Sequence, residues 1–130
     1  MSEARDLTGV WYGRYEAIGV VEVNSFIARL DDVGGAVTGM ISEPHGVDGA
    51  AIRRAFVDGR RTGAQVDFVK QYDGEVFAHA VRYSGLIDDD ATEIVGCWSI
   101  VRHNGTFVMR REKFSREELG EEEAVDLTVR

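Results

Sequence analysis

Fifteen glycines recur at fairly even intervals along the 130-residue chain, which contains a single proline. Most of these glycines separate short stretches that are rich in Val, Ile, Phe, Tyr and Trp. Glycine favours turns because it lacks a Cβ and tolerates positive φ angles. Alternating apolar residues between turns, with turns about every 8–12 residues, are typical of β-strands. The pattern therefore predicts an all-β protein of many short strands.

Eight segments have the strand pattern. They are Gly9–Glu16, a stretch within Val20–Leu30, Ala36–Glu43, Ala51–Asp58, Gln65–Tyr72, Val76–Ser84, Glu93–Val101 and Thr106–Glu112. The fourth segment also has apolar residues at helical spacing, with Asp48 as a candidate N-cap, so strand and helix both remain open there. Asn104-Gly105 is a strong two-residue hairpin signal and predicts a turn before the last strand.

The connections between these segments are too short for crossover helices, which favours an antiparallel meander. Closing eight strands into an up-and-down barrel removes the exposed sheet edges. A barrel of this size holds either packed side chains or one small ligand. We therefore predict one barrel domain over residues 7–114, followed over residues 115–130 by an acidic tail with a capping-box pattern for a short helix. A two-layer sandwich of the same strands is the alternative.

The net charge of −8 and the single cysteine limit the functional classes. An acidic chain lacks the basic footprint of a nucleic-acid-binding protein. One cysteine excludes an intramolecular disulfide, and no apolar run has the length of a membrane-spanning helix. The first residues hold no signal-peptide core, so we expect a cytoplasmic protein. Because no cofactor motif or metal-ligand spacing is recognisable, we expect no cofactor and no metal.

The opening residues Leu7-Thr8-Gly9-Val10-Trp11-Tyr12 resemble the first strand of the calycin superfamily, which contains the avidins, lipocalins and fatty-acid-binding proteins. In lipocalins, a Gly-x-Trp on the first strand packs against an arginine near the last strand. The resemblance assigns these parts to Gly9-Val10-Trp11 and to Arg110 or Arg111.

Two further stretches are similar to avidins. Gly35-Ala36-Val37-Thr38-Gly39 resembles their second hairpin, and Tyr83-Ser84-Gly85 with Trp98 loosely resembles their later strands. The resemblance implies a barrel with a pocket. It implies no particular ligand, because the biotin-binding residues of avidins are not recognisable in this chain.

Period two along the strands brings polar side chains onto the same face as the large aromatic residues. If Trp11, Phe68 and their aromatic equivalents point into the barrel, basic and phenolic side chains point inward with them. The resulting ligand-binding set is Tyr15, Lys70, Tyr72, His79, Tyr83, Trp98 and Arg111. Arg54 joins this set if the fourth segment is a strand with Ile52 and Phe56 inside.

A cation inside the barrel needs a partner, and a carboxylate or phosphate on a ligand would serve. There are two alternatives. Lys70 and Arg111 extend to the rim, where their charges remain in water, or the partner is an acid of the protein, with Asp67, Glu22 and Asp58 as candidates.

Three functional hypotheses follow. The first is binding of a small, partly apolar molecule that is either neutral or anionic. The second is an enzyme of isomerase, cyclase or hydrolase type, with His79 or Tyr83 as acid or base. The third is an interaction protein with a packed interior.

Several outward positions are apolar, which indicates that part of the wall is covered, either by the C-terminal segment or by a second subunit in a homodimer. These positions are Val69, Val95, Cys97, Val101 and Val108.

Overall fold

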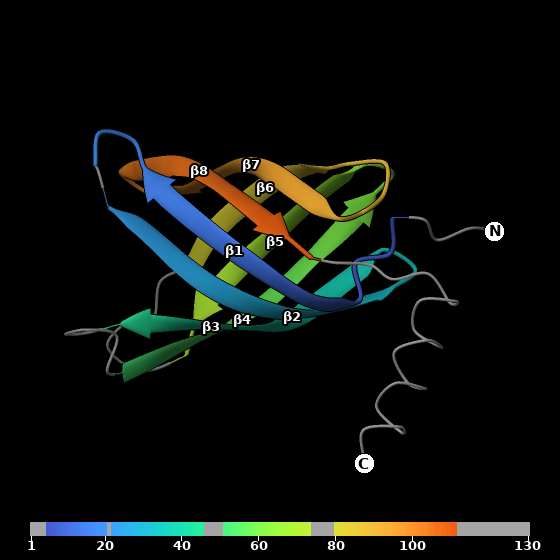
Figure 1. Cartoon of the computed structure of the whole chain (residues 1–130), viewed down its shortest axis with the longest axis horizontal. Coiled ribbons are helices and arrows are strands. Elements are labelled where there is room, and N and C mark those ends of the chain that lie inside the picture. The colour runs from blue at the N-terminus through green and yellow to red at the C-terminus, as the bar shows by residue number, and fades with distance from the viewer. Residues whose placement is uncertain (1–4, 21, 46–50, 74–79, 112–130) are drawn as a thin grey trace, which may run out of the picture.

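The computed structural model describes residues 5–20, 22–45, 51–73 and 80–111, which form a closed barrel of eight strands (Figure 1). The strands are β1 (Gly9–Ala17), β2 (Val23–Val33), β3 (Ala36–His45), β4 (Ala51–Thr62), β5 (Gln65–Tyr72), β6 (Ala80–Ile87), β7 (Glu93–Ile100) and β8 (His103–Arg110). Each strand pairs antiparallel with the next, and β8 pairs with β1. The predicted up-and-down barrel is therefore confirmed, and the fourth segment is a strand.

Parts of the prediction lie outside the described residues. These parts are the acidic tail over residues 115–130 and the first residues of the segment Val76–Ser84, including His79. Within the described ranges, no helix has the length and apolar character needed to cross a membrane.

Large side chains inside the barrel face small residues on the neighbouring strands. Gly59 of β4 lies opposite Phe68 of β5, and Gly96 of β7 lies opposite Phe107 of β8. A Cβ added at Gly59 would collide with β5, and one added at Gly96 would collide with the backbone of β6, the other neighbour of β7. This pairing of small with large lets aromatic rings fill a barrel of only eight strands at the density of a protein interior.

The face that β4 turns toward the interior differs from our prediction. The sequence predicts Ile52, Arg54 and Phe56 inside, but all three are exposed. The structure buries Ala55 instead, which lies opposite Tyr72 of β5. A small residue at this inward position leaves room for the tyrosine ring, whereas an arginine or phenylalanine on the same face would compete with it for volume.

The hairpin between β7 and β8 turns at residues 101–102, so the prediction of a turn at Asn104-Gly105 is wrong. Gly105 lies within β8, opposite Trp98 of β7. A two-residue turn at Asn104-Gly105 would place Arg102 opposite the buried Phe107 and carry its charge into the barrel. Burying an unpaired charge is costly, so this register is disfavoured.

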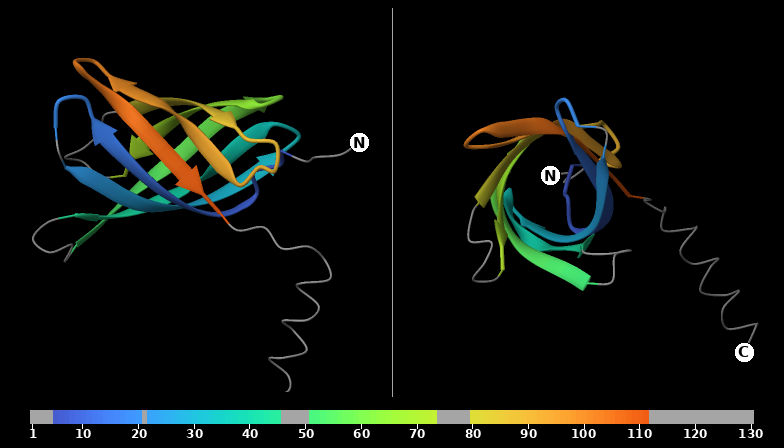
Figure 2. Two further views of the ribbon diagram at one scale, coloured as in Figure 1. Left: turned by 45° about the horizontal axis from the view of Figure 1, so that its top comes forward. Right: turned by 90° about the vertical axis from the view of Figure 1, so that its left-hand side faces the viewer.

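The segment before β1 closes one end of the barrel, which we call the closed end (Figure 2). Leu7 is fully buried, and its backbone N–H donates to the Asp32 carboxylate at 3.0 Å. Asp32 also accepts from the Gly35 N–H at 2.9 Å and from Arg61 Nε at 2.5 Å. Burial of the Asp32 carboxyl acts to raise its pKa, but these hydrogen bonds outweigh burial and lower the pKa below its usual value.

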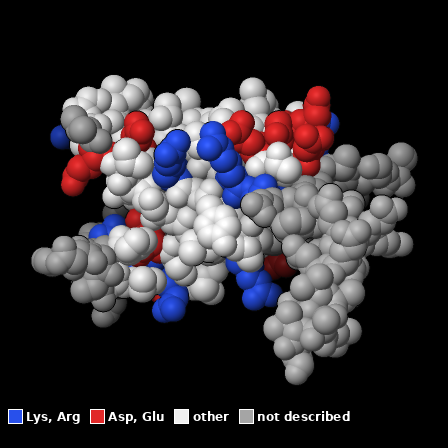
Figure 3. Space-filling model, in the orientation of Figure 1, with Lys and Arg blue, Asp and Glu red and all other residues white. Residues whose placement is uncertain are grey.

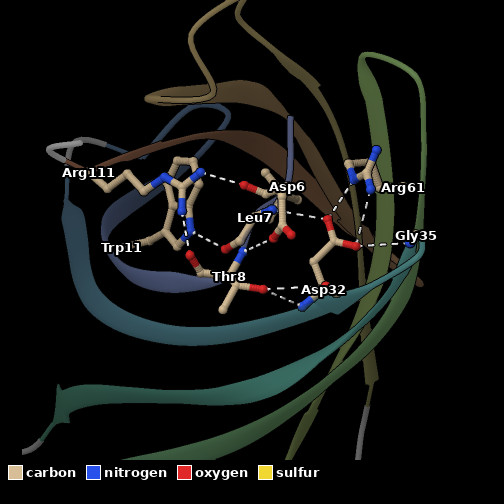
Figure 4. Close-up of polar contacts among 8 residues, drawn as sticks. All are labelled: Asp6, Leu7, Thr8, Trp11, Asp32, Gly35, Arg61 and Arg111. Atoms are coloured by element: carbon tan, nitrogen blue, oxygen red, sulfur yellow. Dashed lines mark hydrogen bonds and ion pairs between the residues drawn. The ribbon is translucent and has the colours of Figure 1, made fainter. Parts of the chain in front are cut away.

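Arg111 ties the end of β8 to the closed end (Figure 4). Its guanidinium carbon lies 4.4 Å from the Trp11 ring centroid. Its nitrogens donate to the backbone carbonyls of Asp6 and Thr8, each at 2.6 Å, and of Ala91 at 2.8 Å. The contact between a first-strand tryptophan and a late arginine, which the calycin resemblance implies, is therefore present, and it uses Arg111.

Candidate functional site

A cavity of about 250 Å³ lies at the opposite end of the barrel, which we call the cavity end. Its volume is that of about eight water molecules, near the lower limit for small-molecule pockets. Its walls are mostly aromatic and aliphatic. The lining residues are Tyr15, Ala17, Arg53, Tyr72, Val81, Tyr83, Trp98, Ile100 and His103. Larger depressions of about 670 and 910 Å³ lie on the outer wall, among exposed polar side chains.

Two tyrosines of the cavity wall also belong to a buried ionic cluster. Lys70 is completely buried, and its Nζ lies 2.6 Å from Oε1 of Glu43, which is 3% exposed. The Tyr72 hydroxyl donates to the same oxygen at 3.0 Å, and the Tyr15 hydroxyl donates to Oε2 at 2.8 Å. Glu43 therefore accepts three hydrogen bonds, and both charges have partners inside the protein.

Aromatic rings surround the Lys70 ammonium. Its Nζ lies 4.7 Å from the ring centroid of Tyr15, 4.8 Å from that of Tyr72, 5.3 Å from that of Phe26 and 5.7 Å from that of Tyr83. Cation–π attraction is strongest when the cation is withdrawn from water, as it is here. The rings therefore stabilise the lysine in addition to Glu43.

The Tyr83 side chain presents a phenolic hydrogen-bond donor on the cavity wall. Its ring stacks on Phe68 at 4.8 Å between centroids and meets the Phe107 ring edge-on at 4.9 Å. Its hydroxyl forms no hydrogen bond with another residue of the described part of the chain. Burial, together with nearby Tyr72 and Glu43, raises the pKa of Tyr83 far above its usual value. The phenol therefore keeps its proton and remains a donor.

Trp98 and Arg53 complete the wall. The Trp98 indole N–H donates to the Glu16 carbonyl at 3.0 Å, which fixes the ring, and the ring meets Tyr15 edge-on at 5.9 Å. The Arg53 guanidinium carbon lies 5.2 Å from the Tyr72 ring centroid, and the side chain is half-buried. The cavity thus combines rigid aromatic walls with a basic group near water.

The structure brings most of the predicted ligand-binding set to the cavity end. These residues are Tyr15, Lys70, Tyr72, Tyr83 and Trp98, with Lys70 behind the tyrosine rings rather than in the cavity wall. Arg111 is at the closed end, against Trp11. His79 lies outside the described residues.

Sequence reasoning missed the partner of Lys70. The lysine neither reaches the rim nor pairs with Asp67, Glu22 or Asp58, because Glu43 meets it inside the barrel. The signal was available: Glu43 shares the period-two face of Val37 and Ile41, which are both fully buried. Arg53 was also missed, since the wrong face of β4 was taken as inward.

No group of three or more His, Cys, Asp or Glu side chains within residues 5–20, 22–45, 51–73 and 80–111 is arranged to hold a metal ion. In comparisons with known proteins, the chain matches no family model and no curated protein sequence. Function is therefore inferred from the chemistry of the site itself.

Proposed function

We propose that the protein binds one small, partly apolar molecule in the cavity end of the barrel. The observation that carries this proposal is a cavity with aromatic walls and one unused phenolic donor, the Tyr83 hydroxyl. These two features favour a flat ligand that has a hydrogen-bond acceptor. Small-molecule sites commonly combine apolar walls with a few placed polar groups. An aromatic ketone or amide has the shape and chemistry that fit.

The ionic cluster determines the polarity of this ligand. An unpaired Lys70 would call for an anionic ligand, but Glu43 already provides the negative charge. The inner part of the ligand is therefore uncharged in our proposal. Where the ligand is anionic, its charged group lies at the rim beside Arg53, which is half-buried and close to solvent.

The hydrogen bonds of the buried Glu43 carboxylate favour binding over catalysis. Both carboxylate oxygens of Glu43 accept hydrogen bonds from protein groups, and Tyr15 and Tyr72 are engaged as donors to it. General acid–base catalysis needs a proton-transferring group within hydrogen-bond reach of the substrate. The cluster instead fixes the shape of the cavity floor, as expected of a preorganised binding site.

We also infer that the barrel is calycin-like. Eight antiparallel strands in sequence order, the Trp11–Arg111 contact and a cavity at one end support this inference.

Tryptophan fluorescence tests the binding proposal, because the chain has two tryptophans, one at each end of the barrel. Trp11→Phe leaves Trp98 as the reporter of the cavity. Titration with acetophenone is expected to give a saturable change in its emission. In the Trp98→Phe control, the emission of Trp11 at the closed end is expected to stay unchanged during the same titration.

A matched pair of probes tests the role of Tyr83. Tyr83→Phe is expected to weaken acetophenone binding about 2–10-fold, the usual contribution of one hydrogen bond. Binding of ethylbenzene, which lacks the acceptor, is expected to be unaffected by this change. Absence of a saturable Trp98 response to either probe, or an equal response from Trp11, would refute the proposal.

A further inference from the structure

The outer wall of β1 to β4 carries a group of exposed apolar side chains, which we call the apolar belt. It consists of Val10, Tyr12, Ile27, Met40 and Phe56, which are between 41% and 63% exposed. Tyr12 lies opposite Ile27, and Met40 lies opposite Phe56. Single exposed apolar residues are ordinary, but several of them gathered on four neighbouring strands indicate a contact surface.

Exposed arginines are interspersed with the belt. Arg29 lies between Val10 and Met40 in the register, while Arg14 and Arg54 flank it along β1 and β4. These three arginines form no salt bridge with any residue of the described ranges. Figure 3 shows uncharged surface over β1 and β2 with both basic and acidic side chains beside it. Exposed Asp31 and Asp58 flank the opposite side of the belt, so the basic side chains gather on the side of Arg14, Arg29 and Arg54.

The chain supplies a segment with the complementary composition. Residues 112–130 contain seven acidic and three basic residues, a net charge of −4, together with Phe114, Leu119, Val125, Leu127 and Val129. This segment follows Arg111, and Arg110 lies directly opposite Tyr12 of the belt. A surface groove of about 910 Å³ begins there, lined in part by Val10, Tyr12 and Arg110.

We propose that the acidic segment 112–130 binds to the apolar belt of its own barrel. Its apolar side chains cover the belt, and its carboxylates face Arg14, Arg29 and Arg54. The length suffices: four strands are about 15 Å wide at about 4.8 Å between neighbours, and a chain of 19 residues spans at most about 65 Å.

Hydrogen exchange of the full chain, read by mass spectrometry, tests this proposal. Backbone amides within residues 112–130 are expected to exchange at least about threefold more slowly than an unstructured peptide of the same sequence. The double variant Arg14→Glu/Arg29→Glu is expected to abolish this protection. The control Arg60→Glu/Arg82→Glu changes exposed arginines away from the belt and is expected to keep it.

A disulfide experiment locates the contact in a Cys97→Ser background. Leu119→Cys is expected to form an intramolecular disulfide faster with Phe56→Cys than with Leu86→Cys, since Leu86 is an exposed residue of β6 away from the belt. Unprotected amides over residues 112–130 in the wild-type protein would overturn the proposal. So would protection that rises with protein concentration and accompanies a dimer in sedimentation velocity, because the second copy would then occupy the belt.

Discussion

Removing Lys70 from its buried pair is expected to destabilise the barrel strongly. Lys70→Met leaves the Glu43 carboxylate buried without its cation, and breaking a buried ion pair from one side costs about 3–5 kcal/mol. The free energy of unfolding of a domain is about 5–15 kcal/mol, so from about a fifth to all of it is at stake. With a typical dependence on urea of about 2 kcal/mol per M, the unfolding midpoint is expected to fall by roughly 2 M.

A double-mutant cycle distinguishes the ion pair from simple loss of packing. Glu43→Gln alone leaves Lys70 uncompensated, whereas Lys70→Met/Glu43→Gln leaves no charge and retains an amide oxygen for the tyrosine hydroxyls. The double variant is therefore expected to be more stable than the sum of the single changes predicts, by about 2 kcal/mol.

Urea unfolding, followed by tryptophan fluorescence and circular dichroism, provides the measurement. Arg110→Met is the control, because Arg110 and Glu93 form an exposed pair at 2.8 Å whose loss is expected to cost less than about 1 kcal/mol. The reasoning is refuted if Lys70→Met costs no more than this control, or if the two single changes at Lys70 and Glu43 are additive.

Two further changes probe the closed end and the β8 register. Since the pKa of Asp32 is lower in the folded than in the unfolded protein, the unfolded chain takes up more protons below about pH 4, and stability falls there. Denaturation between pH 6 and 2.5 should show a shallower fall for Asp32→Asn; an unchanged slope would contradict this assignment. Gly105→Ala should cost about 1–3 kcal/mol, because its Cβ would collide with the Glu16 carbonyl oxygen. The exposed neighbour Asn104→Ala should be close to neutral, and equal melting temperatures for the two variants would argue against this register.

The strands and most of their inward faces were predictable, because alternation is a local property. Trp11, Phe68 and Phe107 are buried as their period-two pattern indicates. β4 departed from this rule because its inward face is set by volume. Ala55 must leave space for Tyr72 on the next strand, and that requirement is visible only once the register between the strands is known.

The sequence predicted which residue types line the candidate site. It did not predict that Lys70 pairs with Glu43. Alternation placed Lys70 and Tyr72 inside, but Glu43 lies on β3, which is not a sheet neighbour of β5, so the two charges meet across the interior. Contacts through the lumen depend on barrel diameter and strand stagger, which leave no mark in local sequence. Asn104-Gly105 shows the converse case: a strong local turn signal was overridden, because a turn there would carry the charge of Arg102 into the barrel.

The seam between β1 and β8 has a kinetic consequence. Every other strand pairing joins consecutive strands and forms by closing a short loop, whereas the seam joins opposite ends of the barrel sequence. Long-range pairing is slow because the entropy of closing a large loop is lost before any contact is gained. The Arg111–Trp11 contact depends on this late step. Interactions absent from the transition state act on unfolding rather than on folding. Loss of the Arg111 contact is therefore expected to speed the unfolding of the closed barrel and to leave the rate of hairpin formation nearly unchanged.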